Sequence, residues 1–328
     1  MIPRRWADSD RGNAPSMSAI TLESCDQSMQ TLISKADAAL EMLPYLQRFH
    51  GTTVVIKYGG SFMDSPDESL RQGVARDIVF LQTIGINPVV VHGGGKAITA
   101  AMASAGLAAR FVGGMRVTDE AAVKIVERVL SGEINPEIVN TITSLGAQAK
   151  GFSGADVLTA VKFRATGPNN ESLDLGFVGE VTHVEVERLE RCITQGVIPV
   201  VSPTARGEDG KIYNCNADVA AAQAAIALKA RRLVFMSDVP GLLRDPRNPN
   251  TIIPHLRAEE VDGLKRSRVI HTGMIPKIDS AVSALRSGVE KVSLVDGRVP
   301  HAILLEMFGD GSGTDVVACE FDKQIEPA

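Results

Sequence analysis

The sequence has few cysteines, no long hydrophobic run and no excess of basic residues. Its 328 residues include only four cysteines, and no two of them have the C-x-x-C spacing of a zinc or redox motif. No uninterrupted apolar run reaches the roughly 18 residues expected of a membrane-spanning helix. The formal net charge of -5 provides no broad basic surface for nucleic acid. We therefore expect a cytoplasmic protein with no metal held by a side-chain cluster and with neither a nucleic-acid nor a membrane partner.

The N-terminal region has two parts. Residues 1–28 are polar and irregular and lack the apolar core of a secretory signal, which predicts a disordered tail or an upstream start before a real initiator at Met17 or Met29. Residues 29–50 carry one apolar stripe at three- and four-residue steps, which predicts a helix that Pro44 bends or interrupts. This helix needs a surface to cover its stripe, either on its own domain or on another subunit.

From residue 52 onward the sequence alternates strand and helix patterns. Apolar strands such as "TTVVIKY", "INPVVVH" and "VIPVVSP" are separated by helical segments, one with Thr118 as its expected cap and one with an expected start at Asn135-Pro136. This alternation predicts an α/β fold with a mainly parallel sheet covered on both faces. "VLTAVKFRAT" and "LDLGFVGEVTHV", separated by "GPNN", predict an antiparallel hairpin attached to that sheet. A lobe boundary is expected near residues 196–205.

Three glycines and a lysine follow one of these strands, in "VVVHGGGKAIT" (residues 89–99). The spacing is wrong for a P-loop, because Val90 and Ala97 stand where a glycine and a Ser or Thr are needed. It is also wrong for a dinucleotide fingerprint, because Ile98 stands at the sixth position counted from Gly93. Glycines before a helix N-terminus still favour anion binding, but a plain strand-to-helix turn explains the stretch equally well.

Other polar groups stand at the expected carboxyl ends of strands, where ligands bind in parallel sheets. Lys57 precedes the pair Gly59-Gly60, and Ser237 and Asp238 end a later strand. Lys57 is explained by a solvated position at the sheet edge, which its type alone favours, or by an anion site, which the adjacent glycines favour. The residues alone leave both readings open.

Charged residues also stand at two expected helix starts. Lys277 follows Pro276, which suits a first helical turn, so this lysine faces the positive end of the macrodipole unless it turns into water or meets a bound polyanion. Asp218 begins another helix, where acids are common for dipole reasons, but a carboxylate there could also hold two lysines through charge-assisted hydrogen bonds. Both positions are therefore candidates for a shared anion-binding site.

Three further residues could bind a substrate. Arg116 follows paired glycines and could grip a carboxylate with a two-pronged hydrogen bond or pair on the surface. Asn214 and Asn216 could be helix caps or ligands. The histidines show no metal spacing and are interpreted as structural or incidental: His92, His183 and His271.

Eight motifs occur in the order found in N-acetylglutamate kinases, members of the amino acid kinase family. They are "VVIKYGGS", "VVVHGGGKAI", "GMRVTD", "DLGFVGEV", "NCNADVAAAQAA", "FMSDVPGLL", "GMIPKI" and "VDGRVPHAILLEMF". The sequence resembles this family over about residues 40–318. The resemblance implies a three-layer α/β/α sandwich around a large open sheet. It also implies transfer of the γ-phosphoryl group of ATP, with Mg²⁺, to the side-chain carboxylate of N-acetyl-L-glutamate on the route to arginine.

The resemblance also implies a role for each matching residue. Residues 51–200 would form the acetylglutamate-binding lobe and residues 201–328 the ATP-binding lobe. Lys57 and Lys277 would stabilise the transition state, and Asp218 would orient them. The expected acetylglutamate-binding residues are Gly94, Gly95, Arg116 and Asn214, and the expected nucleotide-binding residues are Gly59, Gly60, Ser237 and Asp238. Phosphates and water would hold most of the Mg²⁺ coordination.

The N-terminal helix, with Tyr45 in "LPYLQRF", resembles the arginine-inhibited branch of the family, where the helix swaps between dimers to form a hexamer. In that branch arginine binds near the helix and the C-terminal segment. His301 and Glu306 are kept here, but "FGDGSGT" is shorter than the branch's pattern and lacks its Glu. We expect a homodimer or a homohexamer. Arginine is a candidate effector, but its expected binding site lacks one carboxylate here.

Two alternative functions stay open. One is another kinase of the superfamily, acting on carbamate, aspartate, glutamate or uridylate; Arg116 and "NCNAD" favour acetylglutamate instead. The other is a non-catalytic, arginine-sensing lobe as in acetylglutamate synthases. Such lobes tend to lose the catalytic lysines, whereas Lys57 and Lys277 are both present. The sequence also ends before the acetyltransferase module that follows the lobe in synthases.

Overall fold

The structure is a computed structural model that describes residues 22–59, 68–166, 171–271, 273–309, 311 and 313–317. Most of the predicted N-terminal tail, the turn "GPNN" and Gly60 lie outside these residues. The chain divides into two units, residues 1–44 and residues 45–328. Each unit is described by itself.

The N-terminal helical region is interrupted as Pro44 predicts. Helix α1 spans Leu22–Glu41, and α2 spans Leu43–Phe49 after a break at Met42. Pro44 falls in the first turn of α2, where its missing N–H needs no partner. Tyr45 and Phe49 belong to the larger unit, and Phe49 is fully buried in its core. The predicted segment 29–50 is therefore two helices divided between two units.

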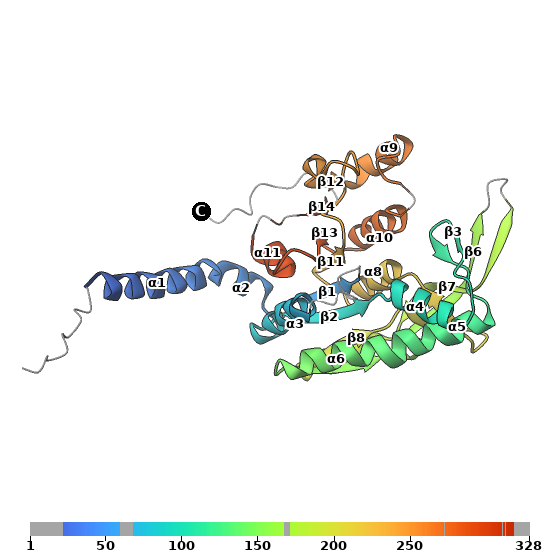
Figure 1. The fold of residues 1–328 in the computed structure, drawn as a ribbon, viewed down its shortest axis with the longest axis horizontal. Coiled ribbons are helices and arrows are strands. Elements are labelled where there is room, and N and C mark those ends of the chain that lie inside the picture. Colours follow the sequence, from blue (N-terminus) through green and yellow to red (C-terminus); the bar gives the residue numbers. More distant parts are fainter. Residues whose placement is uncertain are drawn as a thin grey trace, which may run out of the picture. The chain divides into compact units, whose positions relative to one another are not determined.

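The larger unit is built on one eight-stranded sheet. The strands run in the order β12-β14-β13-β11-β1-β2-β8-β5, and β12 to β8 follow one another down Figure 1. Their bounds are β1 Thr53–Tyr58, β2 Asn87–His92, β5 Gln148–Phe152, β8 Val197–Val201, β11 Arg232–Ser237, β12 His255–Arg257, β13 Lys291–Asp296 and β14 Thr314–Val317. Every pair is parallel except β13 with β14. The predicted mainly parallel sheet is confirmed.

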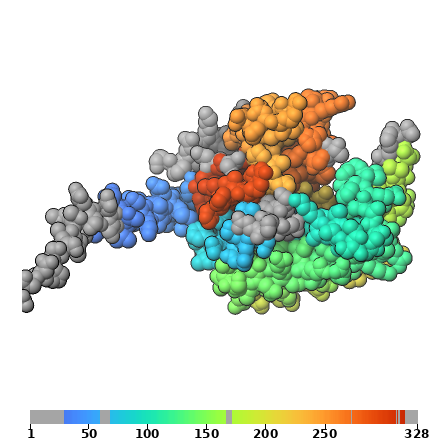
Figure 2. Space-filling view, viewed as in Figure 1, coloured from blue at the N-terminus to red at the C-terminus, as the bar shows by residue number. Residues whose placement is uncertain are grey.

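Helices cover both faces of this sheet. Their bounds are α3 Glu68–Thr83, α4 Gly95–Ser104, α5 Glu120–Glu127, α6 Asn135–Ser144, α7 Val186–Thr194, α8 Ala217–Ala227, α9 Val261–Arg266, α10 Ile275–Arg286 and α11 Ala302–Phe308. Short 3₁₀ turns occupy Gly154–Asp156, Pro249–Thr251 and Ala258–Glu260. Helices α7, α8 and α10 supply side chains to one apolar cluster, and α3, α6 and α11 to another. In Figure 2 the later part of the chain, orange and red, gathers above the cyan and green part.

The alternation of side chains along β1 decides which face Lys57 joins. Val54 and Ile56 belong to the cluster with α3 and α6, whereas Val55 belongs to the cluster with α8 and α10. Successive side chains of a strand point to opposite faces of the sheet, so Lys57 lies on the same face as Val55. The lysine therefore reaches the carboxyl end of the sheet on the side of α8 and α10.

The predicted hairpin forms, but it pairs outside the main sheet. Strands β6 (Leu158–Thr166) and β7 (Ser172–Val184) are antiparallel, and they join β9 (Thr204–Gly207) and β10 (Ile212–Cys215) in a closed four-stranded barrel. The predicted antiparallel hairpin is therefore confirmed, and it pairs with β9 and β10 instead of adding strands to the large sheet. In this arrangement Asn214, on β10, lines the acceptor cleft described below.

Of two predicted helix starts, one differs in its cap and the other agrees with the structure. Asp119, not Thr118, caps α5: its side chain accepts a hydrogen bond from Ala122 N at 2.8 Å, while Thr118 Oγ1 donates to the Arg116 carbonyl. The second expected start, at Asn135-Pro136, is confirmed, because α6 begins at Asn135. A π-helical segment, Arg128–Ile134, runs directly into α6. Proline lacks an N–H and crowds the preceding turn, and a locally widened helix can accommodate both effects.

Candidate active site

One carboxylate oxygen holds two lysines from distant parts of the chain. Asp218 Oδ1 lies 2.9 Å from Lys277 Nζ and 3.1 Å from Lys57 Nζ. The Lys57 side chain is 12% exposed and that of Lys277 is 7% exposed, so neither is the solvated lysine that the sequence left open. Two cations and one anion at this spacing leave a net positive charge in a largely dry place.

Local structure explains how each group arrives there. Asn216 caps α8 by accepting hydrogen bonds from Asp218 N and Val219 N, which puts Asp218 in the first turn of the helix. Lys277 lies in the first turn of α10, as Pro276 predicts. Its ammonium sits 5.0 Å from the centre of the Phe235 ring. Phe235 is also the β11 residue whose backbone pairs with that of Lys57.

Burial and charge shift the pKa values in this cluster. Burial raises the pKa of Asp218, but the charges of Lys277 and Lys57 outweigh that effect and hold the net pKa well below its usual range. Burial lowers the pKa of Lys277 to about 8; the Asp218 carboxylate opposes this shift, and the charge of Lys57 adds to it. The carboxylate is therefore ionised at neutral pH, and Lys277 is close to its titration range.

A cleft of about 840 Å³ opens on one side of the cluster, and we call it the acceptor cleft. Lys57 and Asp218 lie in its wall together with Gly94, Arg116 and Asn214. The sequence analysis predicts that these residues act on one substrate, and the structure brings them to one cavity.

Arg116 enters the acceptor cleft from β4. Strands β3 (Phe111–Val112) and β4 (Met115–Arg116) form a tight hairpin whose two turn glycines have φ of 57° and 82°, values that favour glycine. Arg116 Nη2 donates to Gly95 O at 2.8 Å and to Thr99 Oγ1 at 2.9 Å, and the guanidinium lies 4.7 Å from the Phe111 ring centre. These contacts hold the guanidinium in one orientation at the edge of the cleft.

A second cleft, of about 890 Å³, opens on the other side of the lysines, and we call it the donor cleft. Lys57 and Lys277 line it along with Ser237 and Asp238. Its remaining lining residues are mostly apolar: Val239, Leu242, Leu243, Pro246, Val269 and Met274. Because Lys57 borders both clefts, molecules in the two clefts would meet at the lysine cluster.

The glycines beside Lys57 leave room for its side chain. A Cβ on Gly59 would collide with the Lys57 Nζ and Cε atoms, so only glycine allows the lysine to fold back over this position. Gly93 donates from its N–H to Tyr58 O at 2.7 Å, which ties the glycine loop after β2 to the end of β1. The ends of these two strands therefore form one wall of the acceptor cleft.

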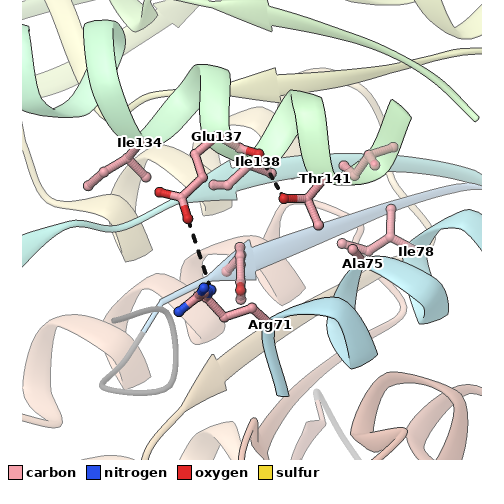
Figure 3. Close-up of a pocket in the computed structure, with 9 residues that line it drawn as sticks. Arg71, Ala75, Ile78, Ile134, Glu137, Ile138 and Thr141 are labelled. Carbon is pink, nitrogen blue, oxygen red and sulfur yellow. Dashed lines mark hydrogen bonds and ion pairs between the residues drawn. The ribbon is translucent and has the colours of Figure 1, made fainter. Parts of the chain in front are cut away.

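A smaller cavity of about 520 Å³ lies apart from this chemistry, between α3 and α6 (Figure 3). Ile78, Ile134 and Ile138 line it, and Arg71 Nε faces Glu137 Oε1 at 4.0 Å (Figure 3). Neither Lys57, Lys277 nor Asp218 borders it. Arg71 already has this acidic neighbour, so the described lining of the cavity lacks the surplus positive charge of the lysine cluster.

Some site residues gave no signal in the sequence. Phe111 lines the acceptor cleft, and no motif marks an isolated aromatic residue as a ligand contact. Met115 also lines the cleft, and its place beside Arg116 in "GMRVTD" was the available signal. His271 lines the donor cleft, and its place six residues before Lys277 was the available signal. Within the described residues, no group of three or more His, Cys, Asp or Glu side chains could hold a metal ion. No described helix has both the length and the apolar character needed to cross a membrane.

Comparison with known proteins assigns the chain to a family. Residues 52–296 match the sequence model of the amino acid kinase family, so the chain belongs to that family. An acetylglutamate kinase from Desulfitobacterium hafniense (strain DSM 10664 / DCB-2) is 46% identical over 285 residues, which cover 85% of this chain and 95% of the relative. The acetylglutamate kinase of Akkermansia muciniphila is 44% identical over 295 residues, covering 89% and 98%. The resemblance drawn from the eight motifs is confirmed.

Solved structures support the same fold. The N-acetylglutamate synthase from Neisseria gonorrhoeae, complexed with coenzyme A and N-acetyl-glutamate, matches with a TM-score of 0.74 and 26% identity. The match covers 87% of this chain but only 64% of the synthase chain. Carbamate kinase from Giardia lamblia bound to AMP-PNP matches with a TM-score of 0.60 and 15% identity, covering 82% of this chain and 99% of the kinase, which shows the fold alone. The predicted fold class is confirmed.

Proposed function

We propose that this protein is an acetylglutamate kinase, which transfers the γ-phosphoryl group of ATP to the side-chain carboxylate of N-acetyl-L-glutamate in arginine biosynthesis. The observation that carries the proposal is the pair of lysines on Asp218 Oδ1, at the meeting point of two clefts. The names of the relatives at 44–46% identity support the choice of acceptor.

The chemistry suits the site. A carboxylate oxygen of the acceptor attacks the γ-phosphorus, the bond from that phosphorus to the β,γ-bridging oxygen breaks, and ADP leaves with its electron pair. The nucleophile is already an anion, so no general base is required. The obstacle is bringing an anion against a polyanion, and phosphoryl transfer is accordingly a matter of positioning and electrostatics. We assign Lys57 and Lys277 to neutralise the migrating charge and Asp218 to hold both lysines in place.

Substrate binding follows from the two clefts. We assign acetylglutamate to the acceptor cleft, with Gly94, Gly95, Arg116 and Asn214 as its binding residues, and ATP to the donor cleft, with Gly59, Ser237 and Asp238 near its phosphates. The described residues offer no metal cage, but a single carboxylate such as Asp238 together with substrate phosphates is a donor set that Mg²⁺ accepts. Mg²⁺ would enter with the nucleotide and draw charge from the phosphates. Gly60 lies outside the described residues.

We further propose that residues 51–200 form the acetylglutamate lobe and residues 201–328 the ATP lobe, with Asn214 and Asp218 of the second range completing the acceptor cleft. We place the enzyme in the cytoplasm. We propose assembly into a homodimer or, through the N-terminal helix, a homohexamer. The shortened segment "FGDGSGT" predicts weaker inhibition by arginine than in relatives that keep the additional Glu.

The test is an assay of the purified chain with MgATP and a panel of acceptors: acetylglutamate, glutamate, aspartate, carbamate and uridylate. ADP formation reports every reaction, and hydroxylamine traps acyl phosphates as hydroxamates. We expect kcat/KM for acetylglutamate to exceed that for glutamate by roughly 100-fold, because an acceptor that leaves a buried polar group unpaired is strongly disfavoured. Preference for another acceptor would assign a different kinase. Absence of ADP formation with tight arginine binding would indicate a sensing lobe instead. The same assay with and without arginine tests regulation.

A further inference from the structure

We infer that His92 and Asn135 act as positioning residues that aim the Gly94 N–H into the acceptor cleft. His92 ends β2 and is fully buried, and the glycine loop follows it directly. Its Nδ1 lies 2.8 Å from the carbonyl oxygen of Gly93. A carbonyl can only accept, so Nδ1 carries the proton and donates.

The partner of the other ring nitrogen supports this tautomer. Asn135 Nδ2 lies 2.9 Å from Val200 O and 3.2 Å from His92 Nε2, with a longer 3.5 Å contact to Phe152 O. The Val200 carbonyl can only accept, so the amide NH₂ of Asn135 faces it, and the second hydrogen is left for His92 Nε2. Nε2 therefore accepts, and the ring is neutral. Burial lowers the pKa of His92 to about 4, in agreement with a neutral ring at physiological pH.

This arrangement decides the direction of a peptide group in the loop. In a trans peptide the carbonyl and the following N–H point in opposite directions. The Gly93 carbonyl is turned toward the buried imidazole, so the Gly94 N–H is turned away from it, on the side where Gly93, Gly94 and Gly95 line the acceptor cleft. If the imidazole did not donate, the carbonyl would lose its partner and this peptide could rotate, which would withdraw the N–H from the cleft.

The surroundings hold Asn135 in the required orientation. Asn135 is 4% exposed and stands where the π-helical segment passes into α6. A Cβ on Gly151, in the edge strand β5, would collide with Asn135 Oδ1, so the glycine leaves the space that this side chain fills. Gly94 is packed from the other side by Leu130 and Ile134 of the same π-helical segment, which any Cβ on Gly94 would strike. The π-helical segment thus holds the Asn135 side-chain amide in place and packs against Gly94.

The inference rests on the proposed function for its consequence, because the Gly94 N–H would face the oxygens of the acceptor and of the migrating phosphoryl group. Outright removal of a preorganised backbone donor of this kind lowers the rate by roughly 10²–10³-fold. A misdirected donor loses part of that contribution. Because the donor acts most strongly on charge developed in the transition state, the loss should appear in kcat more than in KM.

Two substitutions separate positioning from packing. In His92→Asn the amide nitrogen can occupy the place of Nδ1 and still donate to Gly93 O, although the smaller side chain leaves a cavity. His92→Leu fills the space better but donates nothing. We expect kcat of His92→Asn within roughly fivefold of the wild type and kcat of His92→Leu lower by roughly 10–100-fold, with both KM values changed less than about threefold. A purely structural histidine predicts the opposite order, so higher kcat in His92→Leu than in His92→Asn would overturn the inference.

Nitrogen NMR of the wild-type imidazole provides a second test that needs no substitution and no activity. We expect the neutral tautomer with the proton on Nδ1 at pH 7. A proton on Nε2, or a charged ring, would also overturn the inference. Failure of the proposed function looks different: the wild type would then lack turnover on acetylglutamate while the tautomer remained as expected, and the variants would be compared on whichever acceptor of the panel reacts.

Discussion

The ammonium of Lys277 lies 2.9 Å from Asp218 Oδ1, although the two residues are 59 positions apart in the sequence and belong to different helices. Each is in the first turn of its helix, so the two helix N-termini point at one place. Helix N-termini, like lysines, attract anions. The positive ends of α8 and α10 and the two ammonium groups thus reinforce one another at the point where the clefts meet.

Lys277→Ala should abolish most acyl phosphate formation while binding of acetylglutamate survives. The substitution removes a buried cation that borders the donor cleft but not the acceptor cleft. We expect kcat to fall by roughly 10²–10³-fold, measured as hydroxamate, with the acetylglutamate dissociation constant from calorimetry nearly unchanged. Lys124→Ala removes a lysine that is 73% exposed and pairs with Glu120 of its own helix, and it serves as the control. Near-normal turnover in Lys277→Ala would remove the proposed role.

The rate should decline on the alkaline side as Lys277 loses its proton. The pKa of this group is about 8, so the ammonium is present below that pH and is lost as the pH rises through it. We expect kcat/KM to fall above about pH 8. The corresponding limb of kcat should lie at higher pH, because bound polyphosphate favours the charged form. The low pKa of Asp218 means that this carboxylate contributes no limb on the acid side near neutrality. Flat profiles from pH 7 to pH 10 would contradict this assignment.

Asp218→Asn should lower activity and move the alkaline limb toward lower pH. The carboxylate raises the pKa of Lys277, so its removal leaves only the weaker effect of Asp238 against burial and the charge of Lys57. At pH 7 a larger share of Lys277 would then be neutral, and the two lysines would repel when both are charged. The pH profile of kcat/KM measures the shift. Asp174→Asn, which affects a carboxylate 67% exposed and paired with Lys162, is the matched control. An unmoved limb in Asp218→Asn would show that the limb belongs to another group.

Gly59→Ala should lower kcat through Lys57, although it adds only a methyl group. The new Cβ collides with the lysine's Nζ and Cε, and the flexible lysine must leave its position beside Asp218 to relieve the clash. We expect a loss of roughly 10-fold or more in kcat with little change in melting temperature. Gly73→Ala, inside α3 with no atom near the new Cβ, should keep full activity and gain about 0.5–1 kcal/mol of stability. Equal activities in the two variants would argue against the clash.

Truncation should distinguish assembly from folding. Removal of residues 1–44 ends at the boundary between the two units, so the remaining chain keeps its core. We expect activity to be retained and any hexamer to become a dimer, measured by sedimentation or light scattering. Removal of residues 1–50 would also take Phe49, which is fully buried, and Tyr45, whose ring packs edge-on against Phe308 at 6.1 Å. This longer truncation should be destabilised by roughly 3–5 kcal/mol, as for other large aromatic losses. An unchanged assembly state after the shorter cut would exclude the helix as an assembly device.

Much of the fold could be predicted from local patterns. Apolar strands at β1, β2, β8 and β11, the interruption at Pro44 and the helix starts at Asn216 and Pro276 all follow from residue type and spacing. The error in the cap of α5 arose where other contacts compete with a local preference. Asp119 caps the helix, while the Thr118 hydroxyl donates to Arg116 O and accepts from Asn214 Nδ2, which is distant in the sequence. The hairpin was predicted correctly, but its closure into a barrel with β9 and β10 depends on tertiary pairing that no local pattern shows.

The candidate site was predictable as a set of residues but not as an arrangement. The motifs singled out Lys57, Lys277 and Asp218, and no spacing in the sequence states that one oxygen atom serves both lysines. His92 had no metal spacing and was interpreted as structural or incidental. The proposed positioning role of His92 depends on its contact with Asn135, which follows the π-helical segment and is distant from His92 in the sequence.

By itself, the sequence determined the secondary structure of most elements, the family and the residue types available for chemistry, because periodicity, capping and motif order are local properties of the chain. Only the tertiary structure decided that Lys57 and Lys277 share Asp218, that the two clefts meet there, and that Phe49 belongs to the core. These relationships depend on strand order and helix packing, which bring together residues that no local interaction connects. Desolvation in that packed place, more than the identity of the residues, brings the pKa of Lys277 near neutrality.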